Sequence, residues 1–126
     1  MADNQNFIDN GNDTITDLTM KLIWKKKDSF QDTKKWQNWF KCQDYTEITN
    51  IQRFAGSEDW RYPNEAEAWS LFNLDYKNTD KYGDEIYLHK IFEPGAGGTT
   101  WTIDVKDSSA LVVQYEDGVK VWPSKY

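Results

Sequence analysis

Aromatic rings are the side chains of this sequence that point most directly to ligand binding. Tyr76 and Tyr82 lie in the polar segment 75–85, while Tyr87 and Trp101 lie in predicted strands further along the chain. Rings offer a large contact area at a small entropic cost, and they stack on sugars and peptides. We therefore predict a ligand site that includes Tyr76, Tyr82, Tyr87 and Trp101, with Tyr76 and Tyr82 on the surface. Trp101 is also suited to filling the core, because the chain is short of aliphatic residues.

Acidic residues of the same segment form a second candidate site, for a cation. Asp75, Asp80 and Asp84 supply hard oxygen atoms of the kind that Ca²⁺ requires. The earlier acidic run at 9–13 lacks the EF-hand pattern and is predicted to be a turn. A solvated acidic loop is the default interpretation of segment 75–85. We therefore predict no resident metal or other cofactor and keep calcium at the three aspartates as the alternative.

The tripeptide Asp59-Trp60-Arg61 allows a functional and a structural interpretation. The planar guanidinium of Arg61 is suited to a carboxylate ligand. Alternatively, Trp60 packs in the core while Asp59 and Arg61 hold the turn against the next helix by charge-assisted hydrogen bonds. We favour the structural interpretation, because a turn that enters a helix has free backbone amides to satisfy.

No catalytic set can be assembled from the sequence. No motif places a serine or cysteine near the one histidine, His89, and the one cysteine, Cys42, is predicted to face the core from a helix. A single cysteine also excludes an internal disulfide. The sequence has neither a phosphate-binding loop nor a zinc pattern. We therefore predict that the protein is not an enzyme.

Two helices and several short strands are predicted to position these residues. Apolar spacing indicates a first helix over 33–44, and Asn64 with Glu67 gives a capping-box signal for a second helix that buries Ala68, Leu71 and Phe72. Segment 75–85 is rich in turn formers and is predicted to be a surface loop. Strands are predicted over 14–16, 22–24, 86–88, 101–103, 110–115 and 119–122, the last two joined by a hairpin turn. This order of elements is typical of an α+β fold.

Length and charge limit the class of protein. The 126 residues suit one domain, which we place at 7–126 after a flexible segment at 1–6. The net charge of −6 argues against nucleic-acid and anionic-membrane partners, whose affinity comes from clustered lysine and arginine. The one basic run, Lys25-Lys26-Lys27, is followed at once by Asp28. No apolar stretch approaches the roughly 20 residues that span a bilayer, so we predict no membrane insertion, and no signal peptide is recognisable.

Several motifs, in order along the chain, are similar to signatures of one bacterial domain family. The run 54–64 contains Asp59-Trp60-Arg61, segment 7–17 reads Phe-Ile-Asp-Asn-Gly-Asn-Asp-Thr-Ile-Thr-Asp, and segment 110–118 ends in Glu-Asp-Gly. Together they resemble the Lcl C-terminal domain family over most of the chain. The resemblance implies a C-type-lectin-like fold, with two helices, a twisted and mostly antiparallel sheet and long loops. It favours a location at the cell surface or outside the cell, and it implies kinship with sulfatase-modifying factors, whose copper chemistry depends on cysteines.

The chain departs from the family pattern at its C-terminus. The family usually closes with a further strand, whereas this sequence ends at Trp122-Pro123-Ser124-Lys125-Tyr126. The fold therefore finishes with a shorter strand at 119–122, takes a strand from another chain, or lacks its last strand.

The function that these observations favour is non-catalytic binding. We predict a module that holds a glycan, peptide or protein with the loop after the second helix and the segment from Gly95 to Trp101. The alternative is a structural or assembly unit that completes its sheet with another chain. An enzyme related to the sulfatase-modifying factors is the third interpretation, and the lone Cys42 argues against it.

Overall fold

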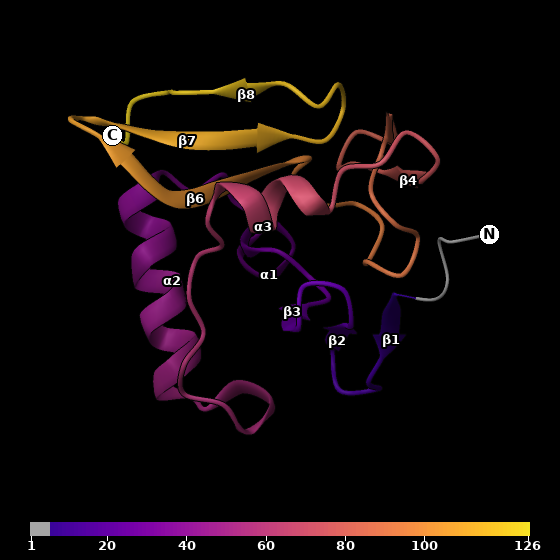
Figure 1. The fold of residues 1–126 in the computed structure, drawn as a ribbon. Helices are drawn as coiled ribbons and strands as arrows, with labels where there is room; N and C mark the ends of the chain where they lie inside the picture. The colour runs from indigo at the N-terminus through magenta and orange to yellow at the C-terminus, as the bar shows by residue number, and fades with distance from the viewer. Residues whose placement is uncertain (1–5) are drawn as a thin grey trace.

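Three helices and three small antiparallel sheets make up residues 6–126, the part of the chain that the computed structural model describes (Figure 1). The predicted α+β class is therefore confirmed. The strands are divided among two three-stranded sheets and one two-stranded sheet, where the sequence suggested a single twisted sheet. Of the predicted flexible segment 1–6, residues 1–5 lie outside the described part of the chain.

The N-terminal sheet is formed by β1 (Phe7–Asp9), β2 (Thr14–Asp17) and β3 (Leu22–Lys25), paired antiparallel in that order. The buried carboxylate of Asp17 stabilises it, because this group accepts from the indole N–H of Trp24 at 3.0 Å and from two backbone amides of the following turn. The predicted strands 14–16 and 22–24 are confirmed, and β3 ends at Lys25, the first residue of the basic run.

The first predicted helix, 33–44, is wrong in its bounds. The structure has a short helix α1 (Ser29–Thr33) and, after a break, the long helix α2 (Trp39–Ile51). Lys34 ends α1 in the left-handed conformation with φ of 62°, and the Asn38 side chain caps α2 by accepting from the Lys41 amide at 2.8 Å. The apolar spacing on which the prediction relied therefore spans two helices and the turn between them.

The second predicted helix is confirmed as α3 (Glu65–Ser70), which follows a 3-10 turn, η2 (Phe54–Gly56). Asn64 and Glu67 form the expected capping box, because each side chain accepts from the other residue's amide at 2.8 Å. Ala68 is fully buried and Leu71 is 5% exposed, while Phe72 is half-buried. The apolar face of α3 packs on the C-terminal sheet.

The C-terminal sheet contains β6 (Thr99–Lys106), β7 (Ser109–Gln114) and β8 (Lys120–Val121), with β7 in the middle. The predicted hairpin between the last two strands is present. The last strand, β8, is shorter than the predicted 119–122 and pairs with β7 rather than with the first strand. The small sheet of β4 (Asn78–Thr79) and β5 (Glu85–Ile86) lies within the predicted loop, and the predicted strand 86–88 retains only its first residue.

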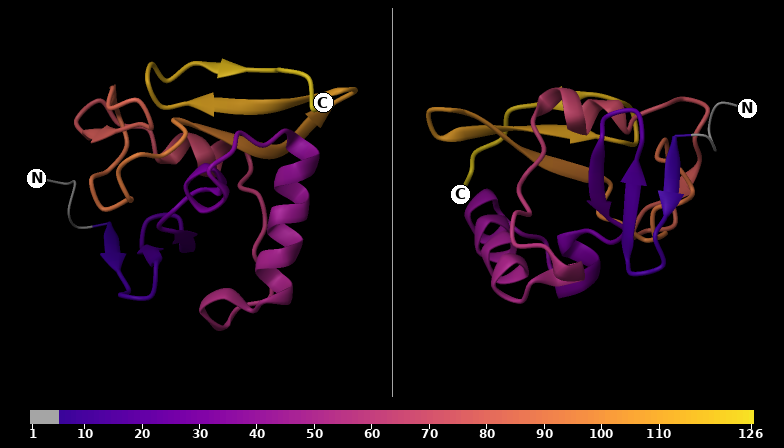
Figure 2. Two further views of the ribbon diagram at one scale, coloured as in Figure 1. Left: turned by 180° about the vertical axis from the view of Figure 1, so that it is seen from behind. Right: turned by 60° about the horizontal axis from the view of Figure 1, so that its bottom comes forward.

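The core lies between these sheets and α3. The views in Figures 1 and 2 place the C-terminal sheet along one side of the molecule and the N-terminal sheet on the other. Rings and branched aliphatic side chains fill the space between them: Phe7, Ile15, Ala68, Leu71, Tyr76, Ile86, Leu88, Phe92, Val113 and Tyr115. Over residues 6–126, no helix is long and apolar enough to cross a membrane.

Candidate functional site

The loop after α3 and the segment from Gly95 to Trp101 lie side by side. The Lys81 amide donates to the Ala96 carbonyl at 2.8 Å, and Asp80 and Ala96 form a parallel β-bridge. The Lys81 ammonium also donates to the Gly97 carbonyl at 3.2 Å. The two segments from which the sequence predicted a ligand site are therefore joined by backbone hydrogen bonds.

Three aromatic rings surround the Lys81 ammonium. Its Nζ lies 4.7 Å from the ring centroid of Tyr82, 5.3 Å from that of Phe30 and 5.4 Å from that of Trp36. Such cation–π contacts orient exposed rings. Tyr82 is 76% exposed and Trp36 is 57% exposed. This cluster presents two large rings to solvent beside the Gly95–Trp101 segment.

A groove begins at Trp36 and runs along the C-terminal sheet. We call it the aromatic groove, and its volume is about 510 Å³. Its rings come from Trp36, from Trp101 and from Tyr126, which is 80% exposed. The indole N–H of Trp101 donates to the Gln37 carbonyl at 3.0 Å, which fixes the β6 wall of the groove against the segment between α1 and α2. The remaining lining residues are Asn38, Lys41, Thr99, Val112, Gln114, Val121, Pro123 and Ser124.

The four rings predicted to bind ligand have different positions. Trp101 lines the aromatic groove and Tyr82 stands next to Trp36 across Lys81. Tyr87 is half-buried, with its ring edge-on to Phe72 at 5.7 Å, and it does not line the groove. The prediction that Tyr76 lies on the surface is wrong, because its ring is 8% exposed.

Tyr76 is buried because its loop folds back over the N-terminal sheet. Its ring packs edge-on against Phe7, at 6.4 Å between centroids, and against His89 at 4.9 Å. A polar segment in sequence thus contributes one ring to the core. No local pattern marked this, since Phe7 and His89 are far from Tyr76 in the chain. The sequence also gave no reason to select Trp36 or Tyr126, which line the groove.

The Asp59-Trp60-Arg61 turn is held to its neighbours mainly through Arg61 and Trp60. The Arg61 guanidinium forms two hydrogen bonds of 2.8 Å with Glu67 in α3, as the structural interpretation predicted. The Trp60 backbone is bound by the Asn50 side chain at 2.7 and 2.9 Å, and its indole donates to the Phe54 carbonyl at 3.0 Å. Trp60 is half-buried rather than in the core, and Asp59 is exposed.

The candidate calcium ligands shape their own loop. The Asp80 carboxylate accepts from the backbone amides of Tyr82 and Asp84 at 2.9 and 3.0 Å, which stabilises the turn between β4 and β5. Asp75 is exposed. Within residues 6–126, no group of three or more His, Cys, Asp or Glu side chains is placed to hold a metal ion.

Cys42 and His89 are both buried, at 8% and 4% exposed. Burial raises the pKa of the Cys42 thiol, which keeps it protonated and a poor nucleophile at neutral pH. His89 accepts from the Ile91 amide at its Nδ1, at 2.9 Å, and its ring packs 5.0 Å from that of Phe7. Both side chains are therefore packed in the interior, and the buried Nε2 of His89 has no hydrogen-bond partner within residues 6–126.

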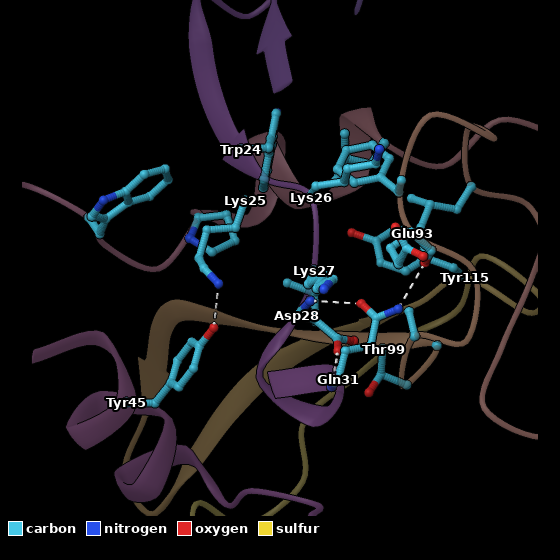
Figure 3. A pocket seen from close by; sticks show the side chains of 18 of the residues that line it. Trp24, Lys25, Lys26, Lys27, Asp28, Gln31, Tyr45, Glu93, Thr99 and Tyr115 are labelled. Atoms are coloured by element: carbon cyan, nitrogen blue, oxygen red, sulfur yellow. Dashed lines mark hydrogen bonds between the residues drawn. The ribbon is translucent and has the colours of Figure 1, made fainter. Parts of the chain in front are cut away.

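A second hollow, which the sequence did not predict, reaches into the core. We call it the central cavity, and its volume is about 210 Å³. Buried side chains of Leu71, Ile86, Leu88, Phe92 and Tyr115 form its inner wall. Figure 3 shows Lys27 and Asp28 between Tyr45 on one side and Glu93 with Tyr115 on the other. The one sequence signal near it is the basic run Lys25-Lys26-Lys27, which lies at its mouth.

A polar network closes one side of this mouth. Lys25 Nζ lies 2.6 Å from the Asp32 carboxylate and 2.7 Å from the Tyr45 hydroxyl, and that hydroxyl also donates to Asp32. Burial opposes ionisation of Asp32, but hydrogen bonds from Lys25 and Tyr45 outweigh it and lower the pKa of Asp32. Burial, together with the neighbouring Asp32, raises the pKa of Tyr45. The network therefore joins β3, α1 and α2 with its charges satisfied.

The fold and the site define a small α+β domain with a ring-lined surface groove. The chain belongs to the Lcl C-terminal domain family, which matches residues 13–126. Searches among curated proteins and among solved structures each returned no match. The family membership that the motifs suggested is confirmed, whereas the C-type-lectin-like arrangement stays a prediction from the resemblance.

Proposed function

We propose that this domain is a non-catalytic binding module that holds a glycan in the aromatic groove, with the loop after α3 at its rim. The observation that carries the proposal is the convergence of Trp36, Trp101 and Tyr126 on one groove of about 510 Å³. These rings come from three separate parts of the chain. Large rings left in contact with water at a concave surface are typical of ligand sites.

The polar residues of the groove suit hydroxyl-rich ligands. Asn38 and Gln114 can both donate and accept hydrogen bonds, and Lys41 can donate. The side-chain oxygen of Asn38 caps α2, which fixes the orientation of the side chain. Its side-chain NH₂ group remains as a donor for a ligand. Rings for the apolar faces of sugars and fixed polar groups for their hydroxyls therefore occur in the same groove.

Two further features support binding rather than catalysis or assembly. The buried thiol of Cys42 has a raised pKa, which disfavours nucleophilic chemistry. At one of the two edges of the C-terminal sheet, β8 pairs over two residues and is followed by Pro123, which lacks a backbone N–H. Short edges next to proline are poor templates for a strand from another chain.

The experiment is an array screen of purified protein against glycans and peptides, run with calcium and with chelator. The best ligand is then titrated against Trp36→Ala and against Trp69→Ala, a control in which an exposed ring outside the groove is removed. We expect Trp36→Ala to weaken binding about tenfold, the loss of about 1.4 kcal/mol of ring contact, and Trp69→Ala to have no effect.

Other outcomes would each redirect the proposal. A glycan hit that is insensitive to Trp36→Ala removes the groove as its site. Peptide hits without glycan hits replace the glycan as the ligand class. Binding that disappears with chelator indicates a calcium-dependent site, for which Asp75, Asp80 and Asp84 are the candidate ligands. No hit, with self-association in light scattering, favours assembly over binding.

A further inference from the structure

The central cavity is open at its mouth and reaches the buried side chains of the core, with a volume of about 210 Å³. An apolar cavity of roughly 150 Å³ is already large enough to admit benzene. The available space therefore matches an aromatic ring with a short side chain.

The inner wall of the cavity is apolar. Leu71, Ile86, Leu88 and Phe92 are each no more than 6% exposed, and their side chains offer no hydrogen-bonding atom. The Tyr115 hydroxyl, the polar atom of this wall, donates to the Ala68 carbonyl at 2.8 Å. Water inside the cavity would have few partners here, so the wall favours an apolar occupant.

Three consecutive lysines line the mouth of the cavity, together with the acids Asp28 and Glu93. Lys25 is paired with Asp32 at 2.6 Å and Lys26 with Asp9 at 2.9 Å. Lys27 forms no ion pair and no hydrogen bond of its side chain within residues 6–126. The charge of Lys27 interacts with that of Asp32 without a direct contact, so Lys27 is the lysine of the run whose ammonium has no hydrogen-bonded partner in the described part of the chain.

The acids near this mouth are already engaged. Both oxygens of Asp28 accept backbone amides, one from Gln31 at 2.9 Å and one from Gly97 at 2.8 Å. Glu93, the other acid of the lining, interacts electrostatically with Lys26. Neither carboxylate forms an ion pair with Lys27.

We propose that the central cavity binds a small aromatic monocarboxylate, with its ring against the apolar inner wall and its carboxylate at Lys27. The half-buried indole of Trp24 lines the same cavity and adds a ring face near the mouth. A carboxylate at a half-buried ammonium forms a charge-assisted hydrogen bond, which is stronger than a neutral one. This site is distinct from the aromatic groove. The linings of the two sites have one residue in common, Thr99.

The test is an NMR titration of the full chain with 3-phenylpropanoate and with its neutral amide. We expect saturable shifts at the amides of Leu71 and Ile86, and about tenfold tighter binding of the acid, as one charge-assisted hydrogen bond provides. In Lys27→Gln the two probes should bind equally. Lys35→Gln, which removes an exposed lysine outside the cavity lining, should retain the preference for the acid.

A substitution that fills the cavity provides a second, independent test. Ala96→Leu places extra carbons in the lining and should abolish binding of both probes. If this variant fails to fold, Thr49→Leu fills the cavity from the α2 side and should have the same effect. The proposal is overturned if neither probe saturates, if Lys27→Gln binds the acid as wild type does, or if Trp36→Ala removes binding, which would place the probe in the aromatic groove.

Discussion

The guanidinium of Arg61 and the carboxylate of Glu67 form a bidentate salt bridge, with both N–O distances equal to 2.8 Å. Glu67 is 8% exposed, and one of its oxygens also accepts the Asn64 amide at 2.8 Å. One carboxylate therefore closes the capping box of α3 and anchors the preceding Asp-Trp-Arg turn. Arg61 of the Asp-Trp-Arg motif is therefore bound to the capping box of α3.

Removing the arginine of this pair should destabilise the domain. We expect Arg61→Ala to lower the free energy of unfolding by about 2 kcal/mol, because a buried carboxylate loses its partner. Urea unfolding measures the change. Arg53→Ala is the control, since Arg53 and Glu58 form an exposed pair at 3.2 Å and such pairs contribute about 0.5 kcal/mol or less. Equal effects of the two substitutions would contradict an anchoring role for Arg61.

The same pair predicts a pH dependence of stability. The hydrogen bond from Arg61 lowers the pKa of Glu67 below its ordinary value of 4.5. A carboxyl group whose pKa is lower in the folded state stabilises the fold above its unfolded pKa, and that contribution is lost as pH falls through the folded pKa. Urea unfolding between pH 7 and pH 3 should therefore show a smaller loss of stability below about pH 4.5 for Glu67→Gln than for wild type. Parallel curves for the two proteins would show that Glu67 does not contribute.

Gly118 is expected to be intolerant of any side chain. Its φ is +73°, and a Cβ there would lie 2.7 Å from the Phe72 ring. Gly118→Ala should cost about 2–3 kcal/mol, from backbone strain together with displacement of the ring. Gly83→Ala isolates the strain, because Gly83 has φ of +82° and open space around the Cβ position, and it should cost about 1 kcal/mol. Thermal unfolding measures the loss of stability in the two variants. Equal losses would exclude a contribution from the clash with Phe72.

The buried hydroxyl of Tyr115 joins β7 to α3 through the Ala68 carbonyl. Tyr115→Phe removes this donor, while the Leu71 amide continues to donate to the same carbonyl at 3.3 Å. We therefore expect a loss of about 1 kcal/mol in unfolding free energy. Tyr82→Phe, in which an exposed ring loses its hydroxyl, should be neutral. A neutral Tyr115→Phe would mean that water replaces the lost donor.

Local signals were enough to predict the elements whose stabilising partners lie within a few residues. The capping box at Asn64 and Glu67 and the hairpin before β8 are stabilised by contacts of this kind, and both are confirmed. The first helix was misplaced, although its caps are also local. Asp28 and Asn38 each begin a helix, and Lys34 takes a left-handed conformation that favours glycine. Apolar spacing alone could not reveal that break.

The sequence by itself determined the α+β class, the family and the cap of α3, because propensity, turn chemistry and motif order act over short stretches of chain. Tertiary structure decided that Tyr76 is buried against Phe7 and His89. It also decided that Trp36, Trp101 and Tyr126 share one groove, and that Lys25-Lys26-Lys27 borders a cavity. These arrangements depend on contacts between segments far apart in the chain. The free energy of such contacts comes from burying whole faces together, so no short pattern of residues records it.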